Sequence, residues 1–154
     1  MTPAKFITIE GTEGAGKSTC MQVVAEQIQA RGIPLLQTRE PGGTPLGGEL
    51  RSVLPGHRED GMAEDAELLL MFAARAEHLQ RKILPALESG QWVLCDRFTD
   101  ATFAYQGGGR QLPMERINAM QDWVQGSFRP SLTLLMDLPV EQGLERAGKR
   151  SQPD

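Results

Sequence analysis

The sequence has little of what marks secreted and membrane proteins. Its two cysteines, Cys20 and Cys95, are too few for a disulfide framework and lack the spacing of a metal site. We expect both to be buried thiols in a reducing cytosol. The longest apolar run, Leu68 to Ala74, has seven residues, whereas a membrane-spanning helix needs about 20. The N-terminus also lacks the basic stretch and long apolar core of a signal peptide. The sequence therefore predicts a cytoplasmic protein without a membrane partner.

Basic charge and aromatic residues are also scarce. The net charge is −4 and the isoelectric point is about 5.3, which argues against non-specific binding to a nucleic-acid polymer, because that needs a basic face. A small anionic ligand held by a few arginines remains compatible with this charge. Aromatic residues make up only 5% of the chain, so we expect a mostly aliphatic core in which methionines fill gaps.

What is present is a regular alternation of short apolar segments and longer helical patterns. Strands are predicted at 6–9, 34–37, 92–95 and 132–136. Helices are predicted after residue 16, ended by Gly32, and at 46–54, 63–89, 113–124 and from 139 toward 146. This order predicts an α/β fold, a parallel sheet with helices on both faces, in a single domain over residues 1–154.

One motif identifies a phosphate-binding loop. Residues 11–18 match the pattern G-x-x-x-x-G-K-[ST] and stand between a predicted strand and a predicted helix. The glycines let backbone N–H groups converge on phosphate oxygens, and the helix N-terminus adds positive potential. Lys17 is expected to neutralise the β- and γ-phosphates and Ser18 to offer a hydroxyl to Mg²⁺. A chance glycine-rich turn is the alternative, which the strand–loop–helix context disfavours. The predicted ATP-binding residues are Gly11, Thr12, Glu13, Gly14, Ala15, Gly16, Lys17, Ser18 and Thr19.

Other classes of P-loop protein fit the sequence less well. A GTPase needs an Asp-x-x-Gly switch and an Asn-Lys-x-Asp motif that reads the base, and the only asparagine is Asn118, followed by Ala119. A motor or transporter subunit is disfavoured by a length of 154 residues. The sequence therefore predicts a small kinase with the P-loop NTPase fold.

Two charged residues occupy unexpected places. Glu13 lies inside the phosphate-binding loop, where it either points away toward a hydroxyl or a metal ion or is a solvated loop charge. Arg75 falls on an apolar helical stripe. It is either a snorkelling arginine or, as we favour, a guanidinium aimed into a pocket beside apolar surface that can face a base. The stripe consists of Leu68, Met71, Phe72, Leu79 and Ile83.

Asp96 and Arg97 directly follow the third predicted strand. Ligands of open α/β sheets bind at the carboxyl ends of the strands. Asp96 is expected to hold a metal ion through water or to orient the attacking group, and Arg97 to bridge the donor and acceptor phosphates. A surface ion pair is the alternative.

Taken together, five segments make the chain resemble the thymidylate kinases of the bacterial type. They are Glu10 to Ser18, Thr38 to Thr44, Phe72 to His78, Asp96 to Phe98 and Ala104 to Gly108. The resemblance implies a nucleoside monophosphate kinase-like fold and transfer of the γ-phosphoryl group of ATP to dTMP with Mg²⁺, which gives dTDP and ADP for dTTP synthesis. It also implies a possible homodimer. Another small P-loop kinase for a nucleotide or a metabolite, and a catalytically impaired nucleotide-binding fragment, stay open as alternatives.

The resemblance also implies roles for individual residues. Lys17, Asp96, Arg97 and Arg150 are expected to be catalytic, with Ser18 and Asp96 at the metal. Arg51 and Arg97 clamp the acceptor phosphate, and Arg75 reads thymine while Met71 or Phe72 packs against the base. The remaining substrate residues are Glu13 near the 3′-hydroxyl, Tyr105 against the sugar, Glu40 and Pro41 in a closing loop, and Thr102 and Gln106 as hydrogen-bonding groups.

The last residues resemble the start of the family's lid. We expect the lid region at about 146–154, with the family's C-terminal portion missing from the chain. Bacterial-type members bring an arginine from the lid, and the phosphate-binding loop here contains none. Arg150 is the expected lid arginine, with a solvated charge as the alternative, and Arg146 is expected to be structural.

Overall fold

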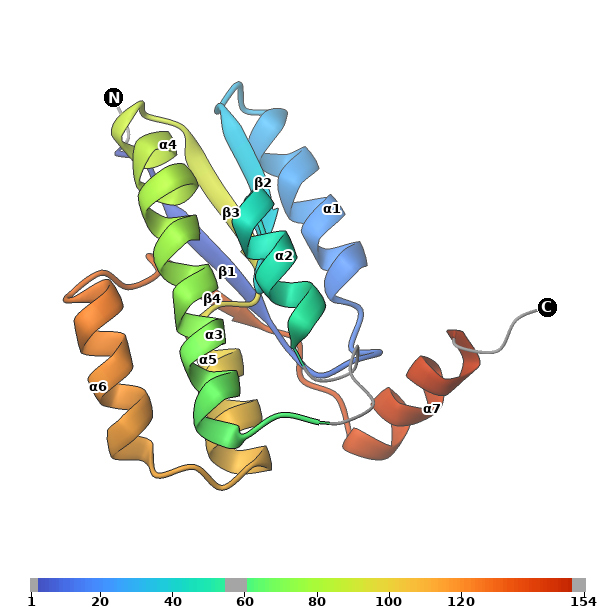
Figure 1. Ribbon diagram of the computed structural model, residues 1–154. Helices are drawn as coiled ribbons and strands as arrows, with labels where there is room; N and C mark the ends of the chain where they lie inside the picture. Colours follow the sequence, from blue (N-terminus) through green and yellow to red (C-terminus); the bar gives the residue numbers. More distant parts are fainter. Residues whose placement is uncertain (1–2, 55–60, 151–154) are drawn as a thin grey trace.

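Four parallel strands form the sheet at the centre of the molecule (Figure 1). The computed structural model describes residues 3–54 and 61–150. The strands are β1 (Phe6–Glu10), β2 (Leu35–Arg39), β3 (Trp92–Asp96) and β4 (Leu132–Leu135), in the spatial order β2-β3-β1-β4. All three strand pairs are parallel, which confirms the predicted parallel sheet.

The helices agree with the sequence prediction except in two places. They are α1 (Lys17–Gln29), α2 (Pro45–Val53), α3 (Glu64–His78), the π-helical turn η1 (Leu79–Ile83), α4 (Leu84–Glu88), α5 (Thr99–Thr102), the π-helical turn η2 (Phe103–Gly109), α6 (Met114–Gln125) and α7 (Val140–Arg150). The single helix predicted at 63–89 is α3, η1 and α4 in continuous succession, with a π turn in its middle (Figure 1). The sequence analysis assigned no element to α5 and η2.

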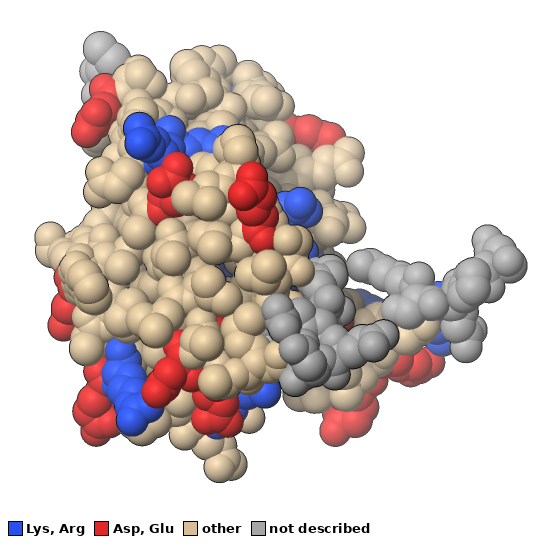
Figure 2. All heavy atoms as spheres, viewed as in Figure 1, with Lys and Arg blue, Asp and Glu red and all other residues tan. Residues whose placement is uncertain are grey.

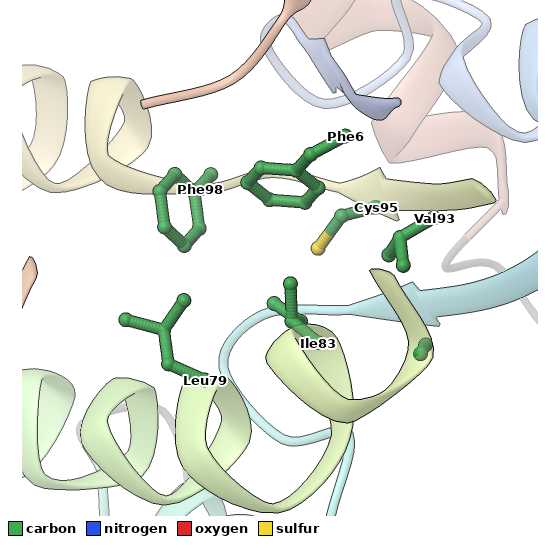
Figure 3. Packing of buried hydrophobic residues seen from close by; sticks show 7 residues of the cluster. Phe6, Leu79, Ile83, Val93, Cys95 and Phe98 are labelled. Carbon is green, nitrogen blue, oxygen red and sulfur yellow. The ribbon is translucent and has the colours of Figure 1, made fainter. Parts of the chain in front are cut away.

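The core lies on both faces of the sheet because successive strand residues point to opposite sides. On one face, Phe6, Val93 and Cys95 pack against Leu79 and Ile83 (Figure 3). The second face is covered by α1. The residues there are Ile7, Ile9 and Leu94 from the sheet and Ala25 and Ile28 from α1. Helices on both faces are thus confirmed.

The two cysteines are free, as predicted, although only Cys95 is fully buried and Cys20 is half-buried. Burial raises the pKa of the Cys95 thiol well above its ordinary value. No helix in residues 3–54 and 61–150 is long and apolar enough to cross a membrane.

Strand register brings the loops that follow β1, β2 and β3 to one edge of the sheet. Asp96 lies opposite Ile9 of β1 on one side and Arg39 of β2 on the other. The first residue after β2 is tied to β3, since the Glu40 N–H donates to the Asp96 carbonyl at 3.0 Å. The first residue after β3 is tied to β1, since the Arg97 N–H donates to the Ile9 carbonyl at 2.9 Å. The phosphate-binding loop, Glu40 and Arg97 therefore lie together.

Candidate active site

The phosphate-binding loop has the backbone that its glycines permit. Gly11, Gly14 and Gly16 have φ values of 150°, 76° and 91°, which residues with a side chain rarely adopt. Gly16 caps α1 without a side-chain cap hydrogen bond, so the helix N-terminus presents N–H groups suited to an anion. The Lys17 Nζ donates to the Thr12 carbonyl at 3.1 Å, and burial lowers the pKa of the Lys17 ammonium.

Beside this loop lies a cleft of about 370 Å³, within the size range of small-molecule sites. It is lined by residues from the loops at the sheet edge and from α2, α3 and η2. The predicted substrate residues that line it are Glu13, Glu40, Pro41, Arg51, Met71, Arg75, Arg97, Tyr105 and Gln106.

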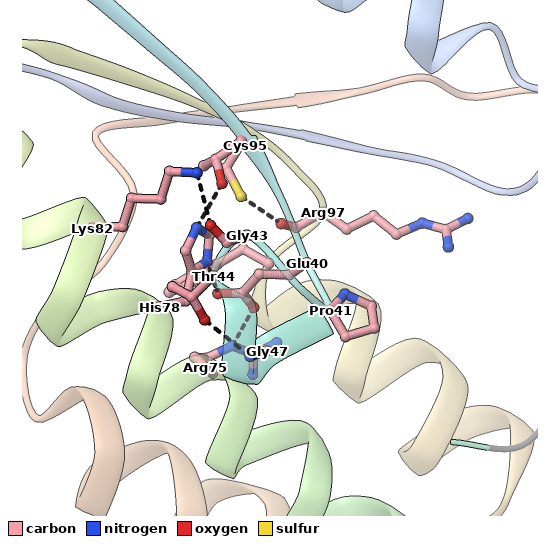
Figure 4. Close-up of polar contacts among 12 residues, drawn as sticks. Glu40, Pro41, Gly43, Thr44, Gly47, Arg75, His78, Lys82, Cys95 and Arg97 are labelled. Carbon is pink, nitrogen blue, oxygen red and sulfur yellow. Dashed lines mark hydrogen bonds and ion pairs between the residues drawn. The ribbon is translucent and has the colours of Figure 1, made fainter. Parts of the chain in front are cut away.

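Arg75 is held at one end of the cleft by two side chains. Its Nε donates to Glu40 Oε2 at 2.6 Å and its Nη2 to Thr102 Oγ1 at 3.0 Å; Figure 4 shows the contact with Glu40. The guanidinium carbon lies 4.9 Å from the centre of the Phe72 ring. The side chain is 1% exposed, so it is not a snorkelling arginine. Its Nη1 is buried without a hydrogen-bond partner, which leaves the N–H groups of this nitrogen for a ligand.

Arg51 and Arg97 both line the cleft. Arg97 has a φ of 64°, and its Nη2 donates to the Tyr105 hydroxyl at 3.2 Å while its guanidinium carbon lies 5.2 Å from the centre of that ring. Arg51 Nη1 donates to the Pro41 carbonyl at 3.1 Å. Within the described ranges, neither arginine forms an ion pair, whereas Arg75 and Arg110 each do. The predicted alternative of an Asp96–Arg97 surface ion pair is therefore not what the structure contains.

Glu10, for which the sequence predicted no role, holds the backbone directly after Arg97. The Phe98 N–H donates to Glu10 Oε1 at 2.7 Å. Burial raises the pKa of the Glu10 carboxyl to about 7, although that hydrogen bond and the charges of Arg97 and Arg75 act in the opposite direction.

Asp96 and Ser18 have the chemistry of a magnesium site. Both line a second cavity next to the phosphate-binding loop. Asp96 Oδ1 is buried without a hydrogen-bond partner, and the Ser18 side chain is exposed. Across residues 3–54 and 61–150, no group of three or more His, Cys, Asp or Glu side chains is placed to hold a metal ion. One carboxylate and one hydroxyl suit Mg²⁺, which keeps waters and substrate phosphates as its other ligands.

Two of the predicted substrate residues, Phe72 and Thr102, do not line the cleft. Phe72 is fully buried in the core beside Leu68 and Ile117, and Met71 takes the place on the cleft wall. Thr102 lies behind Arg75 and accepts its hydrogen bond, so it does not line the cleft. Arg150 is the last residue of α7, and its side chain lies outside the described part of the molecule.

An ion pair that the sequence pattern did not predict also lies in the wall of the cleft. Glu67 Oε1 accepts from Gln106 Nε2 at 2.8 Å, and Glu67 Oε2 pairs with Arg110 Nη2 at 2.9 Å. Gln106 Oε1 is buried without a partner. The signal was available, because Glu67, Met71 and Arg75 recur every four residues along one face of α3.

Comparison with known proteins agrees with this geometry. A family profile described as thymidylate kinase matches residues 9–154. The chain is 60% identical to the thymidylate kinase of Alkalilimnicola ehrlichii over 100% of this chain and 71% of that protein. It is 59% identical to the thymidylate kinase of Pseudomonas syringae pv. tomato over 97% of this chain and 71% of that protein.

A solved structure agrees as well. The crystal structure of thymidylate kinase from Ehrlichia chaffeensis superimposes with a TM-score of 0.82 at 35% identity, and the match covers 96% of this chain and 80% of that one. This chain thus spans about 71% of the length of the two relatives above. The phosphate-binding loop, the cleft beside it and these matches establish that the chain belongs to the thymidylate kinase family.

Proposed function

We propose that the cleft is the dTMP site and the phosphate-binding loop the ATP site of this kinase. As a thymidylate kinase, the chain transfers the γ-phosphoryl group of ATP to dTMP and gives dTDP and ADP. The observation that carries the assignment is the division of the cleft into two kinds of polar group. Arg75 and Gln106 have unpaired atoms that suit a neutral base, and Arg51 and Arg97 form no ion pair within residues 3–54 and 61–150.

The base end has the polarity of thymine. Arg75 Nη1 is an unpaired donor and Gln106 Oε1 an unpaired acceptor. Thymine offers an acceptor at O4 and a donor at N3, so we assign Arg75 to O4 and Gln106 to N3–H. Cytosine presents a donor at N4 and an acceptor at N3, the opposite polarity. Met71, on the cleft wall, supplies apolar surface for the ring.

The phosphate end has the charge that a phosphate monoester requires. Glu40 and Glu67 already neutralise Arg75 and Arg110. Arg51 and Arg97 are left for the acceptor phosphate, and two such cations match a group that carries close to two negative charges. Arg97 directly follows Asp96, which places it beside the phosphate-binding loop and lets it contact both phosphates as charge moves between them.

The remaining predicted residues fit between these ends. Glu13 is exposed and lines the cleft, which supports its assignment to the 3′-hydroxyl of dTMP. Tyr105 lines the same cleft and supports the Arg97 guanidinium with its ring, which supports its assignment beside the sugar. Lys17 neutralises the donor phosphates. Arg150 stays a prediction for the lid arginine.

Mg²⁺ is part of the proposal. Asp96 and Ser18 would hold it, and the ion would neutralise charge on the ATP phosphates. Thr19 completes the ATP-binding segment at the start of α1.

We further propose a homodimer through the face over α2, α3 and α6. A groove there is lined by the apolar residues Leu46 and Leu50 of α2 and Ala73 and Ala76 of α3, together with Glu77, Gln80 and Arg81. Trp123 of α6 is 82% exposed. Figure 2 shows that the middle of this face is largely uncharged, with acidic and basic side chains toward its ends. Sedimentation of the wild type and of Leu46→Glu tests the dimer.

The free cysteines are compatible with the proposed cytosolic location.

Calorimetric titration with dTMP and thymidine tests the assignment of the two ends. The ratio of the two dissociation constants measures the contribution of the phosphate. We expect Arg51→Gln to lower this ratio about tenfold, because it removes a charge-assisted hydrogen bond from the phosphate alone. Arg75→Met should weaken both ligands together and leave the ratio unchanged.

Arg110→Gln is the matched control, because it removes an arginine of the same cleft whose charge is already paired with Glu67. It should leave the ratio unchanged. If Arg51→Gln and Arg110→Gln lowered the ratio of the two dissociation constants equally, the division of the cleft into a base end and a phosphate end would be contradicted.

A further inference from the structure

We propose that His78 is a positioning residue for dTMP: it fixes the orientation of the Glu40 carboxylate, which in turn fixes the Arg75 guanidinium. The inference rests on the proposed role of Arg75 at the base end. His78 does not line the cleft, and its effect is exerted through the two residues between it and the substrate.

Both ring nitrogens of His78 are engaged in the interior. The residue is 0% exposed. Nδ1 lies 2.9 Å from Glu40 Oε1, and Nε2 lies 2.7 Å from Thr38 Oγ1. Figure 4 shows His78, Glu40 and Arg75 next to one another, with dashed contacts between them. The ring thus joins β2 and the loop after it to α3.

The donors and acceptors of this network can be assigned one by one. A Glu40 carboxylate only accepts hydrogen bonds, so the proton must be on His78 Nδ1 and that nitrogen donates. The other ring nitrogen, Nε2, faces the Thr38 hydroxyl at 2.7 Å. Arg75 Nε donates to the second oxygen of Glu40 at 2.6 Å. With Arg75 Nη2 on Thr102, only Nη1 has no partner within the protein.

The loop after β2 is packed closely on the His78 ring. Gly43 has a φ of 84°, and a Cβ at this position would overlap the His78 ring. Lys82 Nζ donates to the Gly43 carbonyl at 2.7 Å from the next turn of the same helix. The π turn η1 begins directly after His78 and contains Lys82, and π turns recur at functional sites.

This arrangement decides which guanidinium donor is offered to the base. His78 Nδ1–H occupies Glu40 Oε1, so the carboxylate has a single oxygen for Arg75. Without that donor, Glu40 Oε1 would be a buried acceptor lacking a partner. With both of its oxygens free, the Glu40 carboxylate favours a bidentate ion pair with the Arg75 guanidinium. Arg75 would then turn toward Glu40 and remove a donor from the base.

Two substitutions separate the two ring nitrogens. The His78→Asn amide nitrogen replaces Nδ1, and the His78→Gln amide nitrogen replaces Nε2. We expect His78→Gln to raise the dissociation constant of dTMP about tenfold or more, the usual effect of an unsatisfied buried acceptor. We expect the constant for ATP to stay within about twofold, as for an independent site. His78→Asn should restore most of the dTMP affinity.

A double variant distinguishes positioning from general loosening. If His78 acts through Arg75, His78→Gln should have no further effect on dTMP binding in the Arg75→Met background. Additive losses would overturn the inference. Gln125→Leu is the control for a lost buried hydrogen bond, because it breaks the Thr99–Gln125 contact outside this network. It should destabilise the fold and leave dTMP affinity unchanged.

A spectroscopic measurement on the wild-type protein does not depend on the variants folding. ¹⁵N NMR of histidine-labelled protein should show a proton on Nδ1 of His78. The chain has two histidines, and His57→Asn assigns the signals. An Nε2–H tautomer would overturn the inference. Failure of the proposed function is distinguishable, because Arg75→Met would then leave the preference for dTMP over dCMP unchanged, whatever His78→Gln does.

Discussion

At the scale of single residues, Tyr105 contacts Arg97 and also lines the cleft where the sugar of dTMP is proposed to lie. Its hydroxyl and ring both contact Arg97, and its place in the cleft favours a role against the sugar. We expect Tyr105→Ala to lower the preference for dTMP over its ribose analogue about tenfold, because the space for a 2′-hydroxyl opens. Tyr105→Phe keeps the ring and should keep the preference. The measurement is kcat/KM for both acceptors, and an unchanged ratio in Tyr105→Ala would refute the steric role.

Glu10 makes stability depend on pH in a direction opposite to most carboxylates. Its pKa is raised from 4.5 to about 7 in the fold by burial. The native state therefore binds more protons than the unfolded state between these values, so stability falls as pH rises from 4.5 to about 7 and is then constant. Glu10→Gln keeps an oxygen for the Phe98 N–H and cannot ionise.

The free energies of urea unfolding of both proteins, without ligands, test this from pH 4 to 8. The free energy of unfolding of Glu10→Gln, relative to that of the wild type, should rise by about 3 kcal/mol from pH 4 to pH 8. A constant difference between the two proteins would show that the Glu10 pKa is not raised.

Sequence reasoning named most of the residues that line the cleft but not their hydrogen-bond partners. Arg75 was recognisable because a charge interrupts an apolar stripe, and Asp96 and Arg97 because they end a strand. The stripe could not tell Met71 from Phe72, since both positions share a helix face with Arg75. His78 and Glu10 were missed because their contacts, Glu40 and Phe98, are distant in sequence.

At the scale of elements, α7 rests directly on the phosphate-binding loop. A Cβ at Gly143 would lie 2.9 Å from the Glu13 carbonyl, and a Cβ at Gly14 would overlap the Gly143 carbonyl. Gly143→Ala suits a helix but must displace α7 or the loop. We expect it to raise KM for ATP about tenfold, within the range of overpacking costs, with dTMP affinity unchanged.

Gly148→Ala is the matched control, because the same substitution in the same helix meets no atom within 4 Å. It should leave both constants unchanged. Equal behaviour of the two variants would show that α7 does not set the position of the loop.

Elements were predictable where the pattern is long and strongly periodic. The four strands and the helices around them agree with the apolar spacing. The π turn η1 was not predictable, because a single widened turn shifts the periodicity by only one residue. The segment α5–η2 was missed because the glycines at 107–109 disfavour a helix by local propensity, and its contacts with α6 override that preference.

At the scale of the whole molecule, an acidic chain concentrates arginines in one cleft. The net charge is −4, yet Arg51, Arg75, Arg97 and Arg110 line the same cavity. Parallel strands bring the loops after β1, β2 and β3 to one edge, which the sequence could predict from the fold class. The pairing of two arginines with Glu40 and Glu67 required the structure.

The most direct test of the account is the acceptor preference of the wild-type chain. kcat/KM is measured with ATP and Mg²⁺ for dTMP, dCMP, dAMP and dGMP. With Arg75 as donor and Gln106 as acceptor, dTMP should exceed dCMP by about 10⁴ or more, as in sites that hydrogen-bond their substrate. Arg75→Met should remove most of that preference. Comparable turnover of dTMP and dCMP by the wild type would contradict the assignment of the cleft.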